Sequence, residues 1–273
     1  MPETSTTLML FSALLTMGAG LAAATAAGEQ KGFPVRVLFA SAASSVICFA
    51  AGAAAAVANL GRPSMIFGVL ANPGTPIFEQ FVLLSASMLA VLVYLAALYR
   101  GAQATTCAKI AAAAALLAIA LVFVLGKSRV MPWRAAWNTW TLVLSPLGWT
   151  AVFAAAGFAL MASRAEDDPH PVWLAGSAVT ALICAAIYLA ALAASGNGEA
   201  VEAAGRALTG SVSSLFWGGM VLCGVFIPLA ASFAMRRAPA VCAALSMAGA
   251  FAAVCCNHLL VSALGERLWQ FFG

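Results

Sequence analysis

The chain has 273 residues, of which 64% are hydrophobic and only 8% are charged, and its mean hydropathy is +1.00. A soluble globular domain carries about 25% charged residues, so the composition excludes that class. The net charge of +4 comes without a dense basic run interleaved with aromatic residues, which argues against a nucleic-acid-binding surface. The composition predicts a protein that crosses a lipid membrane several times and has no nucleic-acid partner.

Charged residues and Pro/Gly clusters divide the chain into apolar segments of about 20 residues, the length that a helix needs to cross a bilayer. The segments lack the period-two alternation of a membrane β-barrel. The predicted fold class is therefore all-α, a single membrane domain in which eight transmembrane helices form a bundle. The expected spans are 5–27, 35–58, 78–99, 108–126, 139–163, 172–195, 212–235 and 239–264. The first span is long and lacks an export flank, so we expect a helix rather than a signal peptide.

The lysines and arginines between these spans predict the orientation of the bundle. One set of loops carries seven of them, namely Lys31, Arg36, Arg100, Lys109, Arg164, Arg236 and Arg237. The other set carries six, namely Arg62, Lys127, Arg129, Arg134, Arg206 and Arg267. Three of those six lie in one loop, and if a function retains them there, the remaining bias of seven against three is cytoplasmic. We therefore expect both termini outside the cytoplasm.

Cysteine and histidine are the residues that would bind a metal or a haem. The seven cysteines fall in or beside apolar spans with no Cys-x-x-Cys, which favours packing residues over ligands. His170 lies in an acidic loop and His258 in the last span, and two histidines cannot ligate the two haems of a transmembrane relay. We expect His258 to be a hydrogen-bonded packing residue and the chain to hold no metal, haem or iron–sulfur cluster of its own.

The segment 59–80, between the second and third spans, is long, mostly apolar and rich in Pro and Gly. It contains Arg62, and it ends with Glu79 about one turn inside the third span. A carboxylate beside lipid or a dry cavity can accept a proton, which makes Glu79 the candidate catalytic residue. The alternative is a structural charge at the helix N-terminus, stabilised by the helix dipole.

The segment between the fourth and fifth spans combines cations with aromatic rings. Its residues are Lys127, Arg129, Trp133, Arg134, Trp137 and Trp140, with Trp149 further on. For any single tryptophan, an aromatic belt at the membrane interface is the simpler account. Taken with the segment 59–80 on the same predicted side, however, the two loops supply a carboxylate, guanidiniums and aromatic faces. That combination suits a quinol head group entering from the membrane.

Residues 55–150 also contain several short motifs. They are Asn59-Leu60-Gly61-Arg62-Pro63 with Phe67, then Glu79, Arg129-Val130 and Ser145-Pro146-Leu147-Gly148-Trp149. This arrangement resembles the membrane anchor subunit of the dimethyl sulfoxide reductase family. The resemblance implies a subunit of the bacterial cytoplasmic (inner) membrane, without haem, that oxidises menaquinol in anaerobic respiration. Electrons would pass to an iron–sulfur subunit and then to a molybdopterin catalytic subunit.

The resemblance also implies a quinol site. Its residues would be Asn59, Arg62, Glu79, Arg129, Trp133 and Trp137. The family carries a histidine before its Leu-Gly-x-Pro element, whereas Asn59 stands here, and an amide cannot act as the proton acceptor. The family's acidic residue at the start of the third helix corresponds to Glu79, with a gap of two residues. Arg62 and Arg129 would orient the quinol oxygens or hold an acidic surface of a partner.

A small-solute transporter is the competing class, because small residues, Pro/Gly breaks and an even number of helices also suit paired repeats. No clear sequence repeat relates the two halves, which favours the anchor. A related anchor of the polysulfide-reductase type would share fold and role. The terminal electron acceptor would be selected in another polypeptide.

Overall fold

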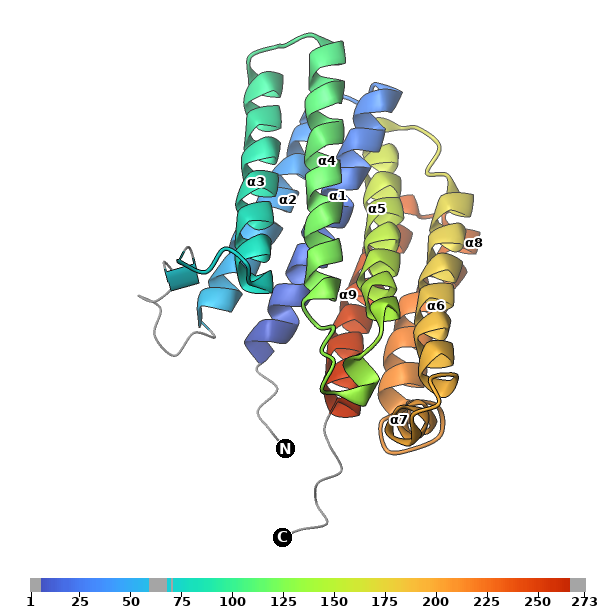
Figure 1. The fold of residues 1–273 in the computed structure, drawn as a ribbon. Helices are drawn as coiled ribbons and strands as arrows, with labels where there is room; N and C mark the ends of the chain where they lie inside the picture. Colours follow the sequence, from blue (N-terminus) through green and yellow to red (C-terminus); the bar gives the residue numbers. More distant parts are fainter. Residues whose placement is uncertain (1–5, 59–67, 70, 266–273) are drawn as a thin grey trace.

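The computed structural model describes residues 6–58, 68–69 and 71–265, and it is a bundle of antiparallel helices (Figure 1). The membrane-length helices are α1 (Thr6–Lys31), α2 (Val35–Ala58), α3 (Pro76–Tyr99), α4 (Ala104–Lys127), α5 (Leu144–Ala165), α6 (Pro171–Ala193) and α9 (Pro239–Leu264). An eighth span joins η4 (Leu215–Phe226), which has π-helical hydrogen bonding, to α8 (Ile227–Ala234). No strand occurs within the described ranges. The prediction of an all-α, multi-pass membrane protein is confirmed.

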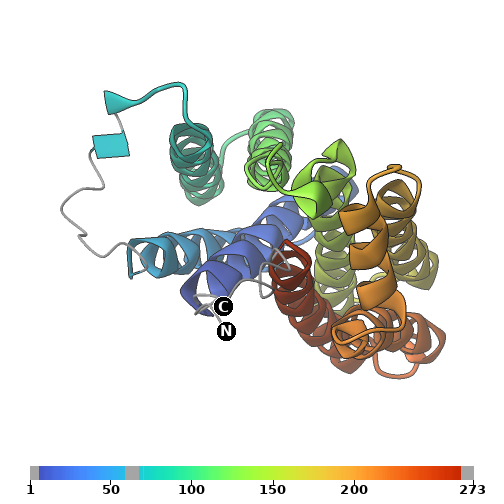
Figure 2. The same ribbon diagram turned by 60° about the horizontal axis from the view of Figure 1, so that its bottom comes forward.

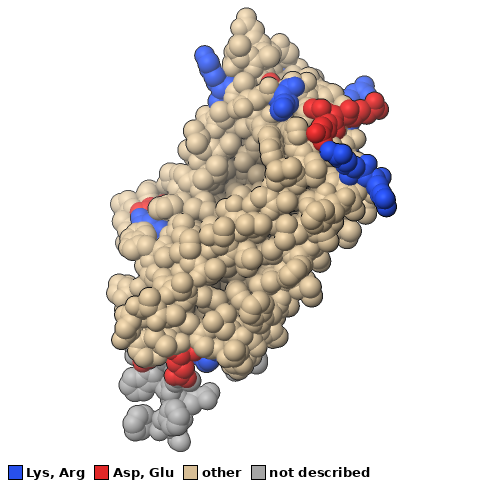
Figure 3. Space-filling view, turned by 90° about the vertical axis from the view of Figure 1, so that its right-hand side faces the viewer, with Lys and Arg blue, Asp and Glu red and all other residues tan. Residues whose placement is uncertain are grey.

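The alternating helix directions define two ends of the bundle. We call one the Arg129 end: α1, α3 and α5 begin there, and α2, α4 and α9 end there (Figure 1). The other, which we call the Glu29 end, carries the loops with seven cations, Lys31, Arg36, Arg100, Lys109, Arg164, Arg236 and Arg237. Charged side chains gather toward the top of the view in Figure 3, and a broad uncharged surface separates them from the few below. The loops that the sequence groups on one side thus lie together.

Two hydrophobic cores meet along α1 and α5. One core is built mainly from α1 to α4, and the other mainly from α5 to α9. The helices approach closely at Gly20 of α1, where an added Cβ would lie 2.4 Å from the Phe153 Cβ of α5. Small residues permit such contacts between membrane helices, whose association depends on packing rather than on burial from water. The first and second halves of the chain therefore form one packed body.

The helix α7 (Gly198–Leu208) has no counterpart among the expected spans. It lies across the Arg129 end, and Figure 2 shows it lying flat over the ends of its neighbours. The Asn197 side chain caps it by accepting from the Glu199 N–H at 3.0 Å. Its buried face consists of Ala200, Ala203, Ala204 and Ala207. A helix of 11 residues with charges on its outer face is too short and too polar to appear in a search for membrane spans.

The segment between α4 and α5 folds into two short 3-10 helices, η2 (Ala135–Trp137) and η3 (Trp140–Val143). The expected span from residue 139 therefore begins with a 3-10 turn, and regular α-helix starts at Leu144. The segment returns tightly against α4, since a Cβ on Gly126 would lie 2.7 Å from the Val143 Cα. This return holds the loop over the ends of α1 and α9.

Candidate functional site

The candidate site lies at the Arg129 end, where the segment 128–143 covers the start of α1 and the ends of α4 and α9. Figure 2 views this end, with α1 between α2 and α9. The Ser128 N–H still bonds the Val124 carbonyl at 2.9 Å, and the Arg129 N–H bonds the Gly126 carbonyl at 3.1 Å. The chain thus leaves α4 in a hydrogen-bonded turn, and Arg129 is the second residue after the helix.

A cavity of about 250 Å³ opens at this place. Its polar lining consists of Ser12, Gln80, Ser128, Arg129, His258 and Ser262. The apolar lining is contributed by Leu8, Phe11, Leu125, Met131, Trp137 and Val261. Five elements or loops, from the first helix to the last, therefore share one hollow with polar groups on an apolar wall. Such a combination is typical of small-molecule sites.

Arg129 joins the first and last helices across the cavity. Its Nη2 donates to the Ser12 Oγ of α1 at 2.7 Å and lies 2.8 Å from the His258 Nδ1 of α9. The Ser12 Oγ in turn donates to the Leu8 carbonyl at 3.0 Å and lies 3.3 Å from the same histidine nitrogen. The guanidinium therefore sits in a fixed polar network rather than extending into lipid.

The charge of Arg129 has no carboxylate partner within salt-bridge distance among the described residues. Burial lowers the pKa of the Arg129 guanidinium to about 10, so the group is still a cation at neutral pH. A partly buried cation beside a cavity is stabilised by oxygen acceptors, most strongly by anionic ones. The site favours a ligand that presents such oxygens.

Trp137 closes the cavity against α9. Its Nε1 donates to the Val261 carbonyl at 2.7 Å, and the Arg134 guanidinium lies 4.3 Å above its ring centre. Arg134 also donates to the Gly265 carbonyl at 2.9 Å. The close approach requires glycine there, because a Cβ on Gly265 would lie 2.2 Å from the indole. One aromatic wall of the site is thus held rigidly.

The structure brings some of the predicted site residues together and not others. Arg129 and Trp137 line the cavity. Trp133 does not, and its side chain is 64% exposed on the surface of the loop. The 3-10 turn η2 places the Trp137 ring against α9, and the assignment of Trp133 to a quinol site stays a prediction. Asn59 and Arg62 lie outside the described residues.

Glu79 lies beside the cavity rather than in its wall. Its carboxylate accepts both 2.9 Å and 2.8 Å bonds from the Lys127 Nζ, and both side chains are 36% exposed. The neighbouring residue, Gln80, lines the cavity and donates to the Ser128 Oγ at 2.7 Å. The ion pair confirms that the start of α3 and the end of α4 meet at one end of the bundle. This charged pair lies next to Gln80, a residue of the cavity wall.

The sequence analysis did not assign His258 to the site. It was expected to be a hydrogen-bonded packing residue, and its contacts with Arg129 and Ser12 fit that expectation, but it also lines the cavity. The available signal was its position, because an ionisable residue inside a membrane span is a functional candidate by default. Ser12 and Gln80 carried no signal, since hydroxyl and amide side chains are common in such helices.

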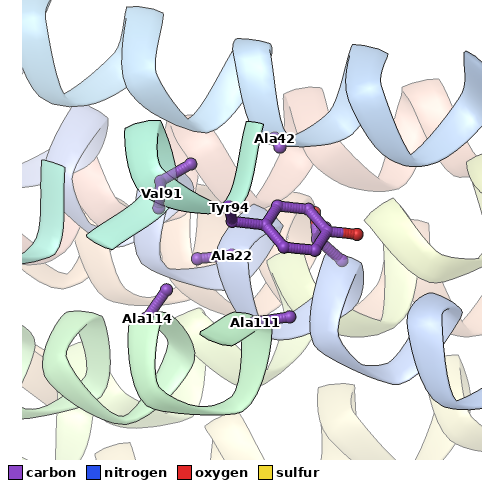
Figure 4. Close-up of a pocket in the computed structure, with 7 residues that line it drawn as sticks. Ala22, Ala42, Val91, Tyr94, Ala111 and Ala114 are labelled. Atoms are coloured by element: carbon purple, nitrogen blue, oxygen red, sulfur yellow. The ribbon is translucent and has the colours of Figure 1, made fainter. Parts of the chain in front are cut away.

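A second polar cluster lies at the Glu29 end. The Tyr94 hydroxyl of α3 donates to the Glu29 carboxylate of α1, and the Thr25 hydroxyl donates to the Ser41 Oγ of α2 at 2.9 Å. A space of about 10 Å³, the size of one water molecule, lies beside it. Figure 4 shows Tyr94 above this space, with small side chains from the surrounding helices, namely Ala22, Ala42, Val91, Ala111 and Ala114.

The cysteines and acidic groups are dispersed through the bundle. All seven cysteines are free thiols, and four of them are only partly buried in the helices α6, η4 and α9. Over the described ranges, no three residues among His, Cys, Asp and Glu lie close enough to hold a metal ion. The candidate chemistry at the Arg129 end therefore comes from its arginine, histidine, amide, hydroxyl and indole groups.

No family model matches the chain, and no curated protein matches its sequence.

Proposed function

We propose that this chain is the membrane anchor and menaquinol-oxidising subunit of a molybdopterin oxidoreductase complex in the bacterial inner membrane, with both termini outside the cytoplasm. The observation that supports the proposal best is the cavity at the Arg129 end. A partly buried cation, a neighbouring imidazole and an indole wall surround a hollow of about 250 Å³ at the end of an apolar bundle. A quinol head group is an apolar ring with two oxygens, and it reaches such a cavity from the lipid.

The proposed chemistry divides the work between subunits. Oxidation of a quinol to a quinone removes two hydroxyl protons and two electrons. Arg129 binds a ring oxygen and stabilises the negative charge that develops when its proton leaves. Trp137 provides a face for the ring. The electrons pass to an iron–sulfur cluster in one partner and then to a molybdopterin subunit.

Glu79 is the proposed acceptor of the protons. It is one residue from Gln80 of the cavity wall and is still 36% exposed, so it can exchange protons with water. Lys127 holds the carboxylate in place through two bonds. Asn59 and Arg62 keep the quinol-binding roles that the resemblance implies.

The first experiment is purification of the tagged chain from its native membrane in mild detergent, with mass spectrometry of its companions, an iron assay and a naphthoquinone-binding titration. We expect stoichiometric recovery of a cysteine-rich iron–sulfur protein and a molybdopterin protein, together with bound iron. A tagged multi-pass protein of unrelated function, treated identically, is the control. A chain that purifies alone, without iron and without affinity for a naphthoquinone, would overturn the proposal.

A small-solute transporter is the second candidate, and the observation that favours it is that Arg129 has no carboxylate partner among the described residues. A cation facing a cavity also suits a small organic anion. Uptake of labelled carboxylates into vesicles that contain the chain alone distinguishes the two functions, because the anchor carries no solute.

A further inference from the structure

The hydrogen bonds of the Arg129 end determine which nitrogen of His258 carries hydrogen. A guanidinium has only donors, so the contact of 2.8 Å between the Arg129 Nη2 and the His258 Nδ1 requires a bare Nδ1. A neutral imidazole with a bare Nδ1 carries its hydrogen on Nε2. The Ser12 contact at 3.3 Å is compatible with the same tautomer, because a hydroxyl can approach a bare nitrogen.

No protein acceptor for the Nε2–H lies among the described residues. Within the described part of the chain, the hydrogen bonds of His258 all involve Nδ1. The residue lines the cavity and is only partly buried, and Nε2 is not among the fully enclosed atoms that lack a partner. The donor is therefore left for water or for a molecule in the cavity.

Around Arg129 and His258 the cavity consequently offers donors. The Ser12 hydroxyl donates its hydrogen to the Leu8 carbonyl, and the Ser12 oxygen accepts from Arg129. The Ser128 oxygen accepts from Gln80, and its hydrogen goes to the Leu125 carbonyl at 2.9 Å. What Arg129 and His258 offer a ligand is N–H of the guanidinium and of the imidazole, while the Gln80 carbonyl and the Ser262 hydroxyl also line the cavity.

We infer that His258 donates its Nε2 hydrogen to a ring oxygen of the bound quinone or quinol and does not take the proton itself. The inference rests on the proposed function. When the quinol O–H bond breaks, the oxygen keeps the electron pair, and the proton goes to water and the carboxylate of Glu79. His258 and Arg129 remain in the protonation states that they have before the reaction and hold the oxygen on which charge develops.

Two substitutions separate the two nitrogens of the ring. In His258→Asn the side-chain carbonyl can replace Nδ1 as the acceptor for Arg129, but nothing replaces the Nε2 donor. In His258→Gln the longer amide carries an N–H near the position of Nε2. His170→Gln at the Glu29 end is the matched control, because it removes the chain's other histidine far from the cavity.

The probe is menadione, an oxidised naphthoquinone, titrated against the purified protein. Loss of one ligand hydrogen bond predicts an affinity about tenfold weaker for His258→Asn, with His258→Gln weakened less and His170→Gln unchanged. The reverse order, in which Asn binds better than Gln, would assign the effect to the Arg129 contact and overturn the inference. Unchanged binding in both variants with lost quinol oxidation would make His258 the proton acceptor, which also overturns it.

Nitrogen NMR of the wild-type protein, with its histidines isotopically labelled, reports which nitrogen of His258 is protonated without any substitution in the site. The chain has two histidines, so His170→Gln assigns the signals. We expect a bare Nδ1 and a protonated Nε2 at His258, and a shift of the Nε2 signal when menadione is added. A protonated Nδ1 would contradict the inference alone. Failure of the wild-type protein to bind menadione at all would instead remove the proposed function and the inference with it.

Discussion

The two ends of α1 carry polar groups in opposite surroundings. Ser12, near its start, belongs to a network with Arg129 and His258 that borders a cavity of about 250 Å³. Glu29, near its end, accepts from Tyr94 next to a space of only about 10 Å³. The first network contains a cation without a carboxylate partner in the described ranges, and the second pairs a carboxylate with a hydroxyl.

The difference lies in what each cluster still requires. The Glu29 cluster joins α1 to α3 through the Tyr94 donor, and the space beside it holds no more than about one water molecule. The Arg129 cluster places an imidazole, and a guanidinium that has no carboxylate partner among the described residues, beside the cavity. Polar groups inside a membrane protein therefore indicate a ligand site only where unmet bonding capacity and space occur together.

Arg129→Ala is expected to have the largest effect on the Arg129 end. Loss of a charged donor predicts an affinity for menadione about a hundredfold weaker, while the fold and the partner proteins are retained. The measurement is a binding titration of the purified complex. Arg164→Ala, which removes an arginine at the Glu29 end, is the control, and equal affinities for the two variants would return the Arg129 loop to a purely structural role.

Glu79→Gln tests whether a carboxylate beside the cavity takes part in quinol oxidation without contributing to ligand binding. The change removes the proposed proton acceptor, so quinol oxidation should slow about tenfold, a moderate loss because water shares the role. Menadione affinity should not change, since Glu79 is outside the cavity wall. The comparison is steady-state turnover against Lys127→Gln, which breaks the same ion pair but keeps the carboxylate. Equal slowing in both variants would show that only the pair matters.

Tyr94→Phe tests the Glu29 end. The substitution leaves the Glu29 carboxylate without its phenol donor, so the free energy of unfolding should fall by about 1 kcal/mol while menadione affinity is unchanged. Thermal unfolding in detergent measures the first and the binding titration the second. Tyr99→Phe, on the same helix but 88% exposed, provides the baseline. A weakened affinity in Tyr94→Phe alone would mean that the two clusters are coupled through α1.

Thr25→Val should give the smallest change. It removes the bond to Ser41 between α1 and α2, and such bonds between membrane helices contribute about 0.6 kcal/mol. Thr180→Val is the control, because that exposed hydroxyl bonds only the Gly176 carbonyl of its own helix. If both variants have the same melting temperature, the bond between Thr25 and Ser41 contributes nothing to the packing of α1 against α2.

Hydropathy predicted the fold because lipid leaves a long apolar segment few alternatives to helix. The spans α2 and α9 have the same bounds in the structure as in the sequence analysis. The helix α7 was missed for the opposite reason, since an alanine face with outward glutamates carries no membrane signal. The π-helical bonding of η4 was also not predicted, and along this element Gly219 and Gly224 pack closely against Cys256 and Trp149.

The site was predictable only where neighbours in sequence are also neighbours in space. Arg129 and Trp137 share one short loop, and their composition indicated a site. The sequence could not show that Gln80, rather than Glu79, lines the cavity, because consecutive helix positions point about 100° apart and the packing decides which of them faces inward. His258 required knowledge that the last helix returns to the first, which no local pattern contains.

The contacts of Arg129 also determine when the site comes into existence. They join residues 117 and 129 positions apart along the chain, and Ser12 and His258 are separated by 246. A nascent chain therefore has no binding site until its final helix has been inserted and has packed beside the first. A molecule that occupies the cavity then stabilises the completed bundle by mass action. The supply of ligand then affects how much newly made protein survives. A chain truncated before α9 has no complete site and is not stabilised in this way.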